Sequence, residues 1–167
     1  MNPAPAEPQD SATAQGSATV SGTIDGQPVP ANDAVGTEIT TSNNGTTVTS
    51  RSVLITSVTN ACPCAIAQTR STILSLTVGM LGADVATGTY SFPDAGTQGG
   101  VAEAQYLVDD AQTNLSPATS GSITISQIGA STIVGNFDVS FATGDHVTGT
   151  FSAPTCATEA PADAGCP

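Results

Sequence analysis

A single histidine is the first residue of this chain that could do chemistry. His146 directly follows Asp145, and an imidazole beside a carboxylate can act as a general base when a nucleophile lies within hydrogen-bond reach. Serine and threonine are abundant, but the sequence contains no Gly-x-Ser-x-Gly nucleophile elbow that would place one of them for attack. We therefore interpret His146 as an exposed turn residue, and we expect no catalytic residue and no enzymatic activity.

Carboxylates are the second group of residues with catalytic or metal-binding chemistry. A pair of acids can hydrolyse a glycosidic bond, but the only adjacent pair, Asp109-Asp110, would point to opposite faces of a strand. Several aspartates could supply oxygen ligands to calcium, but none lies in an Asp-x-Asp-x-Asp-Gly loop followed by a glutamate. These calcium candidates are Asp84, Asp94, Asp109, Asp110 and Asp138. The patterns favour neither a bound metal nor a cofactor.

The cysteines predict covalent cross-links. Cys62, Cys64, Cys156 and Cys166 form an even set, which allows three complete disulfide pairings. A bridge from Cys62 to Cys64 would close a very small ring, so pairing between this segment and the C-terminal cysteines is favoured. A bond from this segment to Cys156 would close a loop of about 95 residues, worth about 4 to 5 kcal/mol in the chain-entropy model. The local alternative, Cys62–Cys64 with Cys156–Cys166, stays open.

The Cys62-Pro63-Cys64 motif also has a functional interpretation. Thiolates bind Cu(I) and Zn, and a strained bridge is easily reduced. A zinc site needs further thiolates or histidines at short spacing, and only the distant His146 is available. Disulfides are typical of proteins outside the reducing cytoplasm. We therefore interpret all four cysteines as disulfide-bonded and the protein as extracytoplasmic.

The charge balance excludes several classes of partner. The 167 residues contain two basic side chains, Arg51 and Arg70, against 14 acidic ones, so the formal net charge is −12. Nucleic acids and anionic lipid surfaces bind clustered Lys and Arg, so neither is expected as a partner. The lack of lysine also excludes a phosphate-binding P-loop, and no apolar run approaches the roughly 20 residues of a membrane span. Charged residues make up only 10%, so the surface must be polar but uncharged.

The N-terminal segment differs in composition from the rest of the chain. Residues 1–16 are rich in Pro, Ala, Gln and Ser, which is typical of a flexible spacer between an anchor and a folded domain. The segment has neither the charged nor the apolar region of a signal peptide, so an export signal or lipid anchor would have to precede residue 1. We expect a flexible tail at 1–16, a folded domain at 17–155 and a disulfide-stapled tail at 156–167.

Alternation of apolar and polar residues predicts that strands position all of these groups. Asp25-Gly26 and Asn44-Gly45 each follow one extended run and precede another region of extended chain, and such pairs favour tight turns. No amphipathic helix is convincing, and residues 60–68 stay unassigned. The expected strands cover residues 17–25, 34–41, 46–59, 72–80, 88–92, 101–108, 122–128, 132–142 and 147–153.

About eight or nine antiparallel strands indicate an all-β fold with little helix. The expected architecture is an antiparallel β-sandwich, of jelly-roll or immunoglobulin-like type, or a flattened barrel. An apolar-x-Gly-x-Phe motif begins at Ile133 and recurs at Val147, so two adjacent strands carry the same face. A glycine next to a phenylalanine ring gives the ring room, which we expect at both copies of the motif.

Short motifs in the C-terminal third resemble uncharacterised bacterial lipoprotein-type β-sandwich domains. The resemblance is carried by Gly121-Ser122-Ile123-Thr124-Ile125-Ser126, by Val134-Gly135-Asn136-Phe137 and by Val147-Thr148-Gly149-Thr150-Phe151-Ser152-Ala153. Gly88-Thr89-Tyr90 is similar to the Gly-x-Tyr strand of these domains, and residues 20–26 are similar to their opening strand and turn. The motifs cover about a third of the chain and imply a β-sandwich in the cell envelope, without any catalytic residue.

A second resemblance is to fimbrial subunits, which are similar in length, rich in Thr, Gly and Ala, and disulfide-bearing. In such subunits an extension of one chain completes the sheet of the next, and residues 1–16 would be that extension. Prolines at positions 3, 5 and 8 and the lack of alternating large apolar residues depart from this pattern. Strand exchange through this tail is therefore the alternative hypothesis.

Together these patterns predict a non-enzymatic structural or binding module, displayed on the bacterial cell surface or secreted. The alternative is a subunit of an extracellular fibre or pilus, assembled by strand exchange or edge pairing. Candidate partners are another copy of the chain, another surface protein, and carbohydrate, since a Thr/Ser row such as residues 46–50 could bind a sugar or a fibre neighbour. Few charges guard the sheet edges, so we expect tails, disulfides or neighbouring subunits to cover them.

Overall fold

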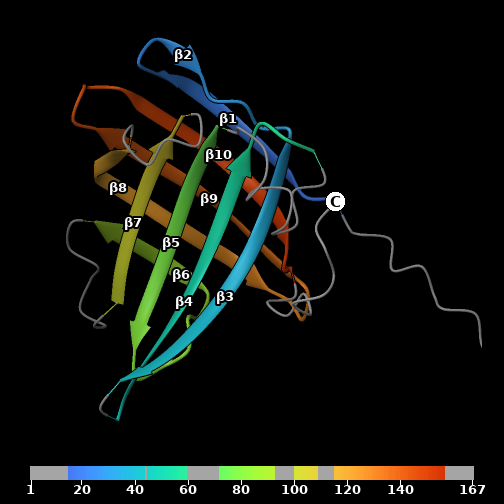
Figure 1. The fold of residues 1–167 in the computed structure, drawn as a ribbon, viewed down its shortest axis with the longest axis vertical. Coiled ribbons are helices and arrows are strands. Elements are labelled where there is room, and N and C mark those ends of the chain that lie inside the picture. Colours follow the sequence, from blue (N-terminus) through green and yellow to red (C-terminus); the bar gives the residue numbers. More distant parts are fainter. Residues whose placement is uncertain (1–14, 44, 60–71, 93–99, 109–114, 157–167) are drawn as a thin grey trace, which may run out of the picture.

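Antiparallel strands make up most of the described chain. The computed structural model describes residues 15–43, 45–59, 72–92, 100–108 and 115–156, and within these ranges it contains ten strands and no helix (Figure 1). The strands are β1 (Ser17–Ile24), β2 (Gln27–Pro28), β3 (Asp33–Asn43), β4 (Thr46–Thr56), β5 (Ile73–Leu81), β6 (Gly88–Phe92), β7 (Gly100–Leu107), β8 (Leu115–Ile128), β9 (Thr132–Phe141) and β10 (His146–Pro154).

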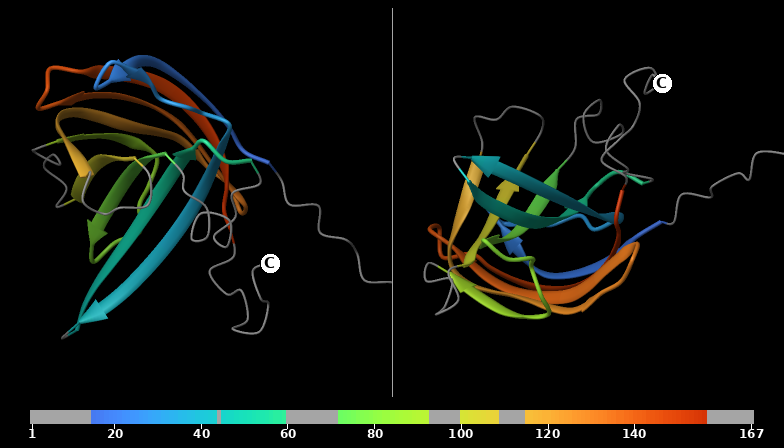
Figure 2. Two further views of the ribbon diagram at one scale, coloured as in Figure 1. Left: turned by 45° about the horizontal axis from the view of Figure 1, so that its top comes forward. Right: turned by 90° about the horizontal axis from the view of Figure 1, so that it is seen from below.

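The ten strands form one sheet with the order β2-β1-β10-β9-β8-β7-β5-β4-β3, and β6 pairs with β8 off this path. The sheet curls on itself into a half-barrel, so that β1, β10 and β9 lie across the interior from β3, β4 and β5 (Figures 1 and 2). The expected all-β fold of antiparallel strands is confirmed. Of the two expected architectures, a β-sandwich and a flattened barrel, the single curled sheet corresponds to the barrel.

Strand β8 joins the two walls of the half-barrel. Its first residues pair with β7, and the remainder pairs with β9 on one side and β6 on the other. The ladder to β9 shifts register between Ala118 and Ser120 and again between Ile125 and Gln127. Such bulges bend a strand and increase its twist, which carries β8 from one wall to the other. The sequence predicted this strand only from Ser122, because the first of these shifts, between Ala118 and Ser120, interrupts the alternation before that point.

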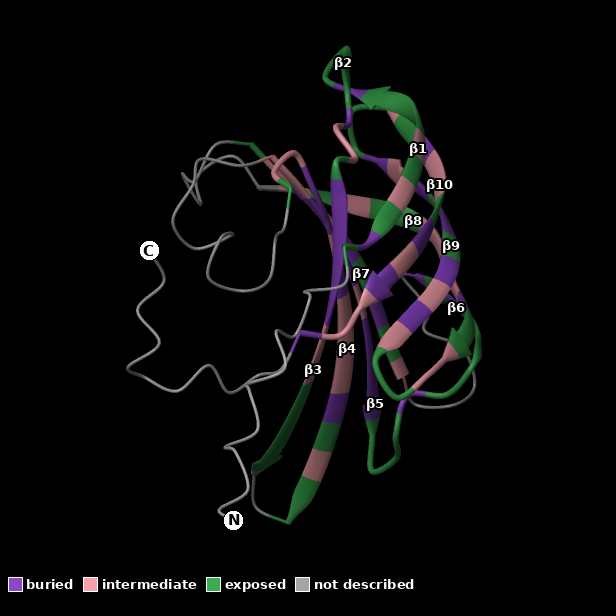
Figure 3. Cartoon of the chain, turned by 90° about the vertical axis from the view of Figure 1, so that its right-hand side faces the viewer, coloured by how far each residue is buried: buried purple, intermediate pink, exposed green. Residues whose placement is uncertain are grey.

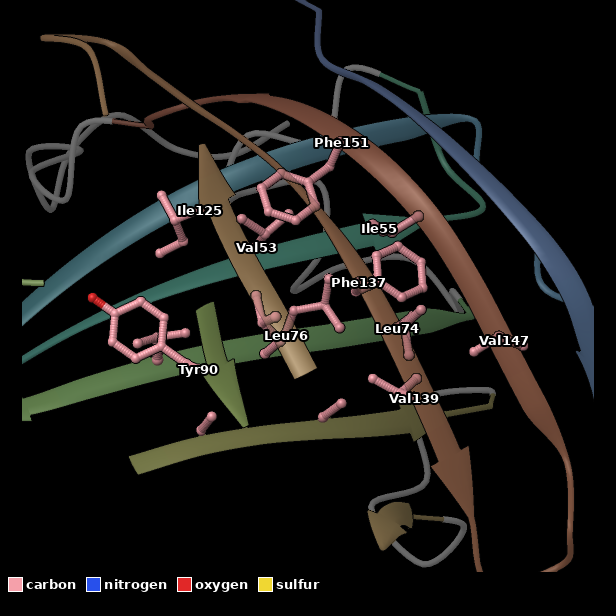
Figure 4. Close-up of a cluster of buried hydrophobic side chains, with 14 of the residues drawn as sticks. Val53, Ile55, Leu74, Leu76, Tyr90, Ile125, Phe137, Val139, Val147 and Phe151 are labelled. Atoms are coloured by element: carbon pink, nitrogen blue, oxygen red, sulfur yellow. The ribbon is translucent and has the colours of Figure 1, made fainter. Parts of the chain in front are cut away.

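The core lies between the two walls and consists mainly of aliphatic side chains. Large residues of β9 and β10 face those of β4 and β5 across the interior (Figure 4). The buried residues labelled there are Val53, Ile55, Leu74, Leu76, Tyr90, Ile125, Phe137, Val139, Val147 and Phe151. Burial of such side chains is worth about 1.5 to 3 kcal/mol each and is the main term that holds the curled sheet closed.

The repeated apolar-x-Gly-x-Phe motif places a glycine opposite each phenylalanine ring. Phe137 pairs in register with Gly149, and Phe151 pairs with Gly135. A Cβ atom on Gly149 would lie 2.6 Å from Cζ of Phe137, and one on Gly135 would lie 2.5 Å from Cζ of Phe151. The rings therefore fill the space that a larger residue would need, as the sequence predicted.

Tight turns fix the registers of two hairpins. Asp25 and Gly26 have φ angles of 51° and 72°, and they join the paired residues Ile24 and Gln27. Two positive φ angles are typical of a type I′ turn, which is the turn that Asp-Gly favours. Strands β3 and β4 pair along their whole length without a shift, as expected for the Asn-Gly hairpin. Both turn predictions are confirmed.

Contacts at the beginning of β3 close one end of the half-barrel. The buried carboxylate of Asp33 accepts a hydrogen bond from the Gly16 N–H at 2.9 Å. The Cys156 N–H donates to the Gly36 carbonyl at 3.0 Å, beside a parallel bridge from Gly36 to Thr155. The residues that flank β1 and β10 thus hold β3 as far as Gly36.

Most of the two predicted tails, residues 1–16 and 156–167, lies outside the described residues. Residues 1–14 and 157–167 are outside the described residues, so the predicted domain limits at 16 and 156 stay predictions. Within the part of the chain that the structure describes, no helix could cross a lipid bilayer.

Candidate interaction surface

His146 lies at the first residue of β10, directly after the turn, and its side chain is 51% exposed. Its Nε2 atom lies 2.8 Å from Oδ1 of Asp138, a residue of the neighbouring strand whose side chain is 63% exposed. Water screens a pair as open as this one, so its free energy is small. The structure places the histidine on the surface, as the sequence predicted, and pairs it with Asp138 rather than with Asp145.

Asp145 connects two turns. Its Oδ2 atom accepts a hydrogen bond from the Thr143 hydroxyl at 2.5 Å and another from the Asp25 N–H at 3.0 Å. These hydrogen bonds, the one from Thr143 first, hold the pKa of the Asp145 carboxyl below its ordinary value. The carboxylate thus ties the turn before β10 to the turn before β2, which is a structural role.

The calcium candidates do not gather at one place in the described structure. Asp138 lies beside His146, and Asp84 is an exposed residue between β5 and β6. Asp94, Asp109 and Asp110 lie outside the described residues. Among the residues that are described, no group of three or more His, Cys, Asp or Glu could hold a metal ion.

Cys156 is buried on the outer side of the sheet. It packs with the buried Val35 and with the partly buried Leu54 and Val58, in a small cluster separate from the main core. The residue is disulfide-bonded. The other cysteines, Cys62, Cys64 and Cys166, lie outside the described residues, so the pairing of the four cysteines stays a prediction.

Arg51 places a charged group on the core-facing side of β4, in line with the buried Val53 and Ile55. Its guanidinium pairs at 2.5 Å with the carboxylate of Glu38, the residue opposite it on β3. The side chains of Arg51 and Glu38 are 14% and 39% exposed. The buried Nε atom of Arg51 has no hydrogen-bond partner among the described residues. The pair neutralises Glu38, the only charged side chain of β3 beyond Asp33.

Strand β3 has an open edge beyond Gly36. The Gly36 carbonyl points away from β4, because it accepts the Cys156 N–H. Backbone groups alternate in direction along a strand, so those of Glu38, Thr40 and Ser42 point to the same side, where the described structure pairs no strand with them. Strand β3 is half-buried at Glu38 and exposed from Ile39 to Ser42, and Figure 3 shows the exposed part in green. We call these three residues the open edge.

The other end of the sheet is built differently. The last strand there, β2, has only two residues, and one of them is Pro28. Short edge strands and prolines prevent a further strand from pairing, because proline has no N–H to donate. The open edge of β3, by contrast, has no proline, no lysine and no bulge.

Exposed apolar side chains gather on the outer face next to the open edge. Ile39, Ser50, Gly79 and Val101 lie in one row across β3, β4, β5 and β7. Val48 and Leu81 face each other in the adjacent row on the same side. We call Ile39, Val48, Leu81 and Val101 the apolar strip; they are 52%, 37%, 59% and 64% exposed, and they are four of the five large apolar residues that are exposed in the described chain.

Hydroxyl groups pair repeatedly across neighbouring strands. Residues 46–50, a candidate sugar-binding row, divide between the two faces, since Thr49 is buried and Thr46 and Val48 are exposed on the other side. Elsewhere, hydroxyl side chains on neighbouring strands form hydrogen bonds with each other. The pairs are Thr19–Thr150 at 2.8 Å, Thr89–Thr124 at 2.9 Å, Ser52–Thr77 at 2.9 Å and Ser42–Thr47 at 3.2 Å.

Sequence reasoning missed the apolar strip. The expected strand 72–80 ended before Leu81, and Val101 began the expected strand 101–108 with no face assigned to it. Each residue lies out of phase with a buried neighbour of its own strand, Met80 for Leu81 and Ala102 for Val101. The phase of the alternation was the signal that could have found them. Comparisons with protein-family models, with curated proteins and with solved structures found no match.

Proposed function

We propose that the protein is a non-enzymatic binding module that holds an extended segment of a partner along the open edge. The open edge is the observation that carries the proposal. Three residues in alternation, Glu38, Thr40 and Ser42, present N–H and C=O groups that an added strand would satisfy. Ile39, between them, would contact outward side chains of that strand, and the rest of the apolar strip continues this surface inward from the edge.

The proposal places this module outside the cytoplasm, on a bacterial cell surface or secreted. Support comes from the lysine-free composition and from the disulfide-bonded Cys156. Antibodies raised against the purified chain should label intact, unpermeabilised cells or detect the protein in the medium. Labelling that requires permeabilisation would contradict this placement.

Selection from a phage-displayed library of random heptapeptides on the immobilised full chain tests the binding function. We expect enriched peptides rich in Thr, Ser and β-branched residues, because these favour an extended backbone. Thr40→Lys should remove binding of the enriched peptides, since a lysine on an edge strand opposes strand addition. Thr150→Lys, the same change on the exposed face of the interior strand β10, should leave binding unchanged. Equal binding to both variants would refute the use of the β3 edge.

The alternative function is that of a fibre or pilus subunit. The same open edge favours it, because edges pair between copies as readily as with peptides. The tail that would exchange, residues 1–16, lies almost entirely outside the described residues. Electron microscopy and size-exclusion chromatography of the purified chain should then show long polymers. A species that never exceeds a dimer would contradict the fibre.

A further inference from the structure

We infer that the open edge of β3 binds a second copy of the same edge, in an antiparallel two-fold pairing centred on Thr40. The inference rests on the proposed function, because it takes the open edge as the binding surface and names its partner. Three properties of the edge make it self-complementary: the direction of its backbone groups, the placement of its one charge, and its hydroxyl side chains.

The backbone groups fit a two-fold register. Glu38, Thr40 and Ser42 are spaced evenly about Thr40 and point outward together. When two such edges run antiparallel, Thr40 lies opposite Thr40 of the second copy, and Glu38 lies opposite Ser42 of the second copy. Each of these pairs can exchange two backbone hydrogen bonds, which gives about six in total. The pairing uses every outward backbone group of the open edge.

The single charge of the edge is compatible with this register. Like charges placed directly opposite would be unfavourable, and a chain of net charge −12 repels its own copies. Centring on Thr40 keeps the two Glu38 side chains apart and sets each against a serine hydroxyl that can donate to its carboxylate. Arg51 already neutralises Glu38 within its own chain. The edge is thus a locally neutral part of an acidic molecule.

The hydroxyl side chains repeat a contact that the chain already makes. Thr19 and Thr150, and likewise Thr89 and Thr124, pair their hydroxyls at 2.8 and 2.9 Å across neighbouring strands. Thr40 is exposed and would meet Thr40 of the second copy in the same relation. On the other face, Ile39 would lie beside Thr41 of the second copy, so the apolar strips of two chains would belong to one continuous sheet surface.

Analytical ultracentrifugation of the full chain, from micromolar to millimolar concentration, tests the association. We expect a monomer–dimer equilibrium whose dimer fraction rises with NaCl, because salt screens the repulsion between the acidic chains. Thr40→Lys should remove the dimer throughout this range. Thr150→Lys, which changes the charge equally, should retain it. Far-ultraviolet circular dichroism and thermal unfolding of both variants check that the fold is preserved.

Cysteine substitution tests the register. Residues opposite each other in a hydrogen-bonded antiparallel pair, as Thr40 would be with Thr40 of the second copy, have Cα atoms about 5.5 Å apart, within the range of a disulfide. Thr40→Cys should therefore form a covalent dimer on oxidation, seen on a non-reducing gel against the wild-type chain. Ser42→Cys alone should not, since its two copies would be about 14 Å apart along the strands. A mixture of Glu38→Cys and Ser42→Cys chains should cross-link.

A monomer under all conditions, a dimer that Thr40→Lys leaves intact, or cross-linking by Ser42→Cys without Thr40→Cys would each overturn the inference. Long polymers would also overturn it, because a two-fold pairing closes on itself. These outcomes differ from failure of the proposed function. If the chain stays monomeric but binds peptides through the open edge, the proposed binding function holds. Only the proposal that the partner is a second copy is then wrong.

Discussion

Gly135 and Gly149 show how single residues decide the packing between β9 and β10. Each lies opposite a phenylalanine of the adjacent strand, and the ring covers the glycine backbone. The two pairs are reciprocal, because β9 supplies Gly135 and Phe137 while β10 supplies Gly149 and Phe151. A slip of two residues would bring the rings against each other, so these pairs also select the register.

Gly149→Ala should destabilise the fold by about 1 to 3 kcal/mol, as expected of overpacking in a core. The added Cβ would lie 2.0 Å from the Thr19 carbonyl oxygen and 2.6 Å from the Phe137 ring. Gly79→Ala is the matched control, since its nearest atom would be 3.8 Å away. It should be neutral or stabilise by up to about 1 kcal/mol. Urea denaturation measures both, and equal losses of stability would contradict the steric explanation.

Asp145 makes the turns sensitive to acid. A carboxyl whose pKa is lowered in the folded state stabilises the fold above its unfolded pKa, and this contribution is lost as the pH falls through the folded pKa. Thr143→Val should raise the pKa of Asp145 toward its ordinary value, because it removes the first of the two causes. Nuclear magnetic resonance titration of the Asp145 carboxyl measures the shift. Thr119→Val, which removes a hydroxyl bonded to the Ser140 carbonyl, is the control and should leave this pKa unchanged.

Among the elements, the β3–β4 hairpin combines an uninterrupted register with an ion pair on its core-facing side. Arg51 lies on the same face of β4 as the buried Val53 and Ile55, but it is charged and lies at the border of the core. Glu38 compensates the charge from the opposite position on β3. The hairpin can thus extend beyond the core without leaving a buried charge unpaired.

Glu38→Gln should destabilise the chain by about 1 to 2 kcal/mol, since Arg51 loses its charged partner in a site that is only partly screened by water. Arg51→Met in the same chain should restore most of this loss, because a thioether side chain needs no partner there. A double-mutant cycle measured by urea denaturation gives the coupling between the two residues. Additive effects of the two substitutions would show that the pair contributes nothing.

The elements themselves were largely predictable, because the alternation and the turn residues act locally. The Asp25-Gly26 turn, the β3–β4 hairpin and the surface position of His146 all follow from a few neighbouring residues. The partner of His146 did not follow, since contact with Asp138 depends on the register between β9 and β10. The beginning of β8 was missed because the bulge between Ala118 and Ser120 disturbs the period of two.

For the whole molecule, the net charge of −12 causes repulsion between carboxylates within the folded chain and between associated chains. Compaction brings the carboxylates together, so NaCl should raise the urea concentration at the midpoint of unfolding. The variant with Asp84→Asn and Glu103→Gln removes two exposed negative charges and should show a smaller gain. A midpoint that does not respond to salt would mean that this repulsion is negligible in the folded chain.

The closure of the sheet could not be predicted from the sequence. Strand patterns show which residues face inward, but the order of strands depends on bends and long-range contacts. In this chain the bends are the bulges of β8, and the long-range contacts are those of Asp33 with Gly16 and of Gly36 with Cys156. The open edge follows from the same closure, because the described residues that flank β1 and β10 contact β3 at its beginning, from Asp33 to Gly36. The candidate surface was therefore visible only once the strand order was known.

The pairing of β1 with β10 has a mechanical consequence. Ser17, where β1 begins, lies opposite Ser152, near the end of β10, so the chain enters and leaves the described fold at neighbouring points. Tension applied through these two points would break the ladder one pair at a time, from Ser17–Ser152 toward Gly22–Val147, in the manner of a zipper. Strands loaded in this way separate at lower force than strands that slide along each other. A stretched molecule would lose the hydrogen bonds of Gly16 and Cys156 to the beginning of β3 and would then open between β1 and β10, while the β3–β4 hairpin remained intact.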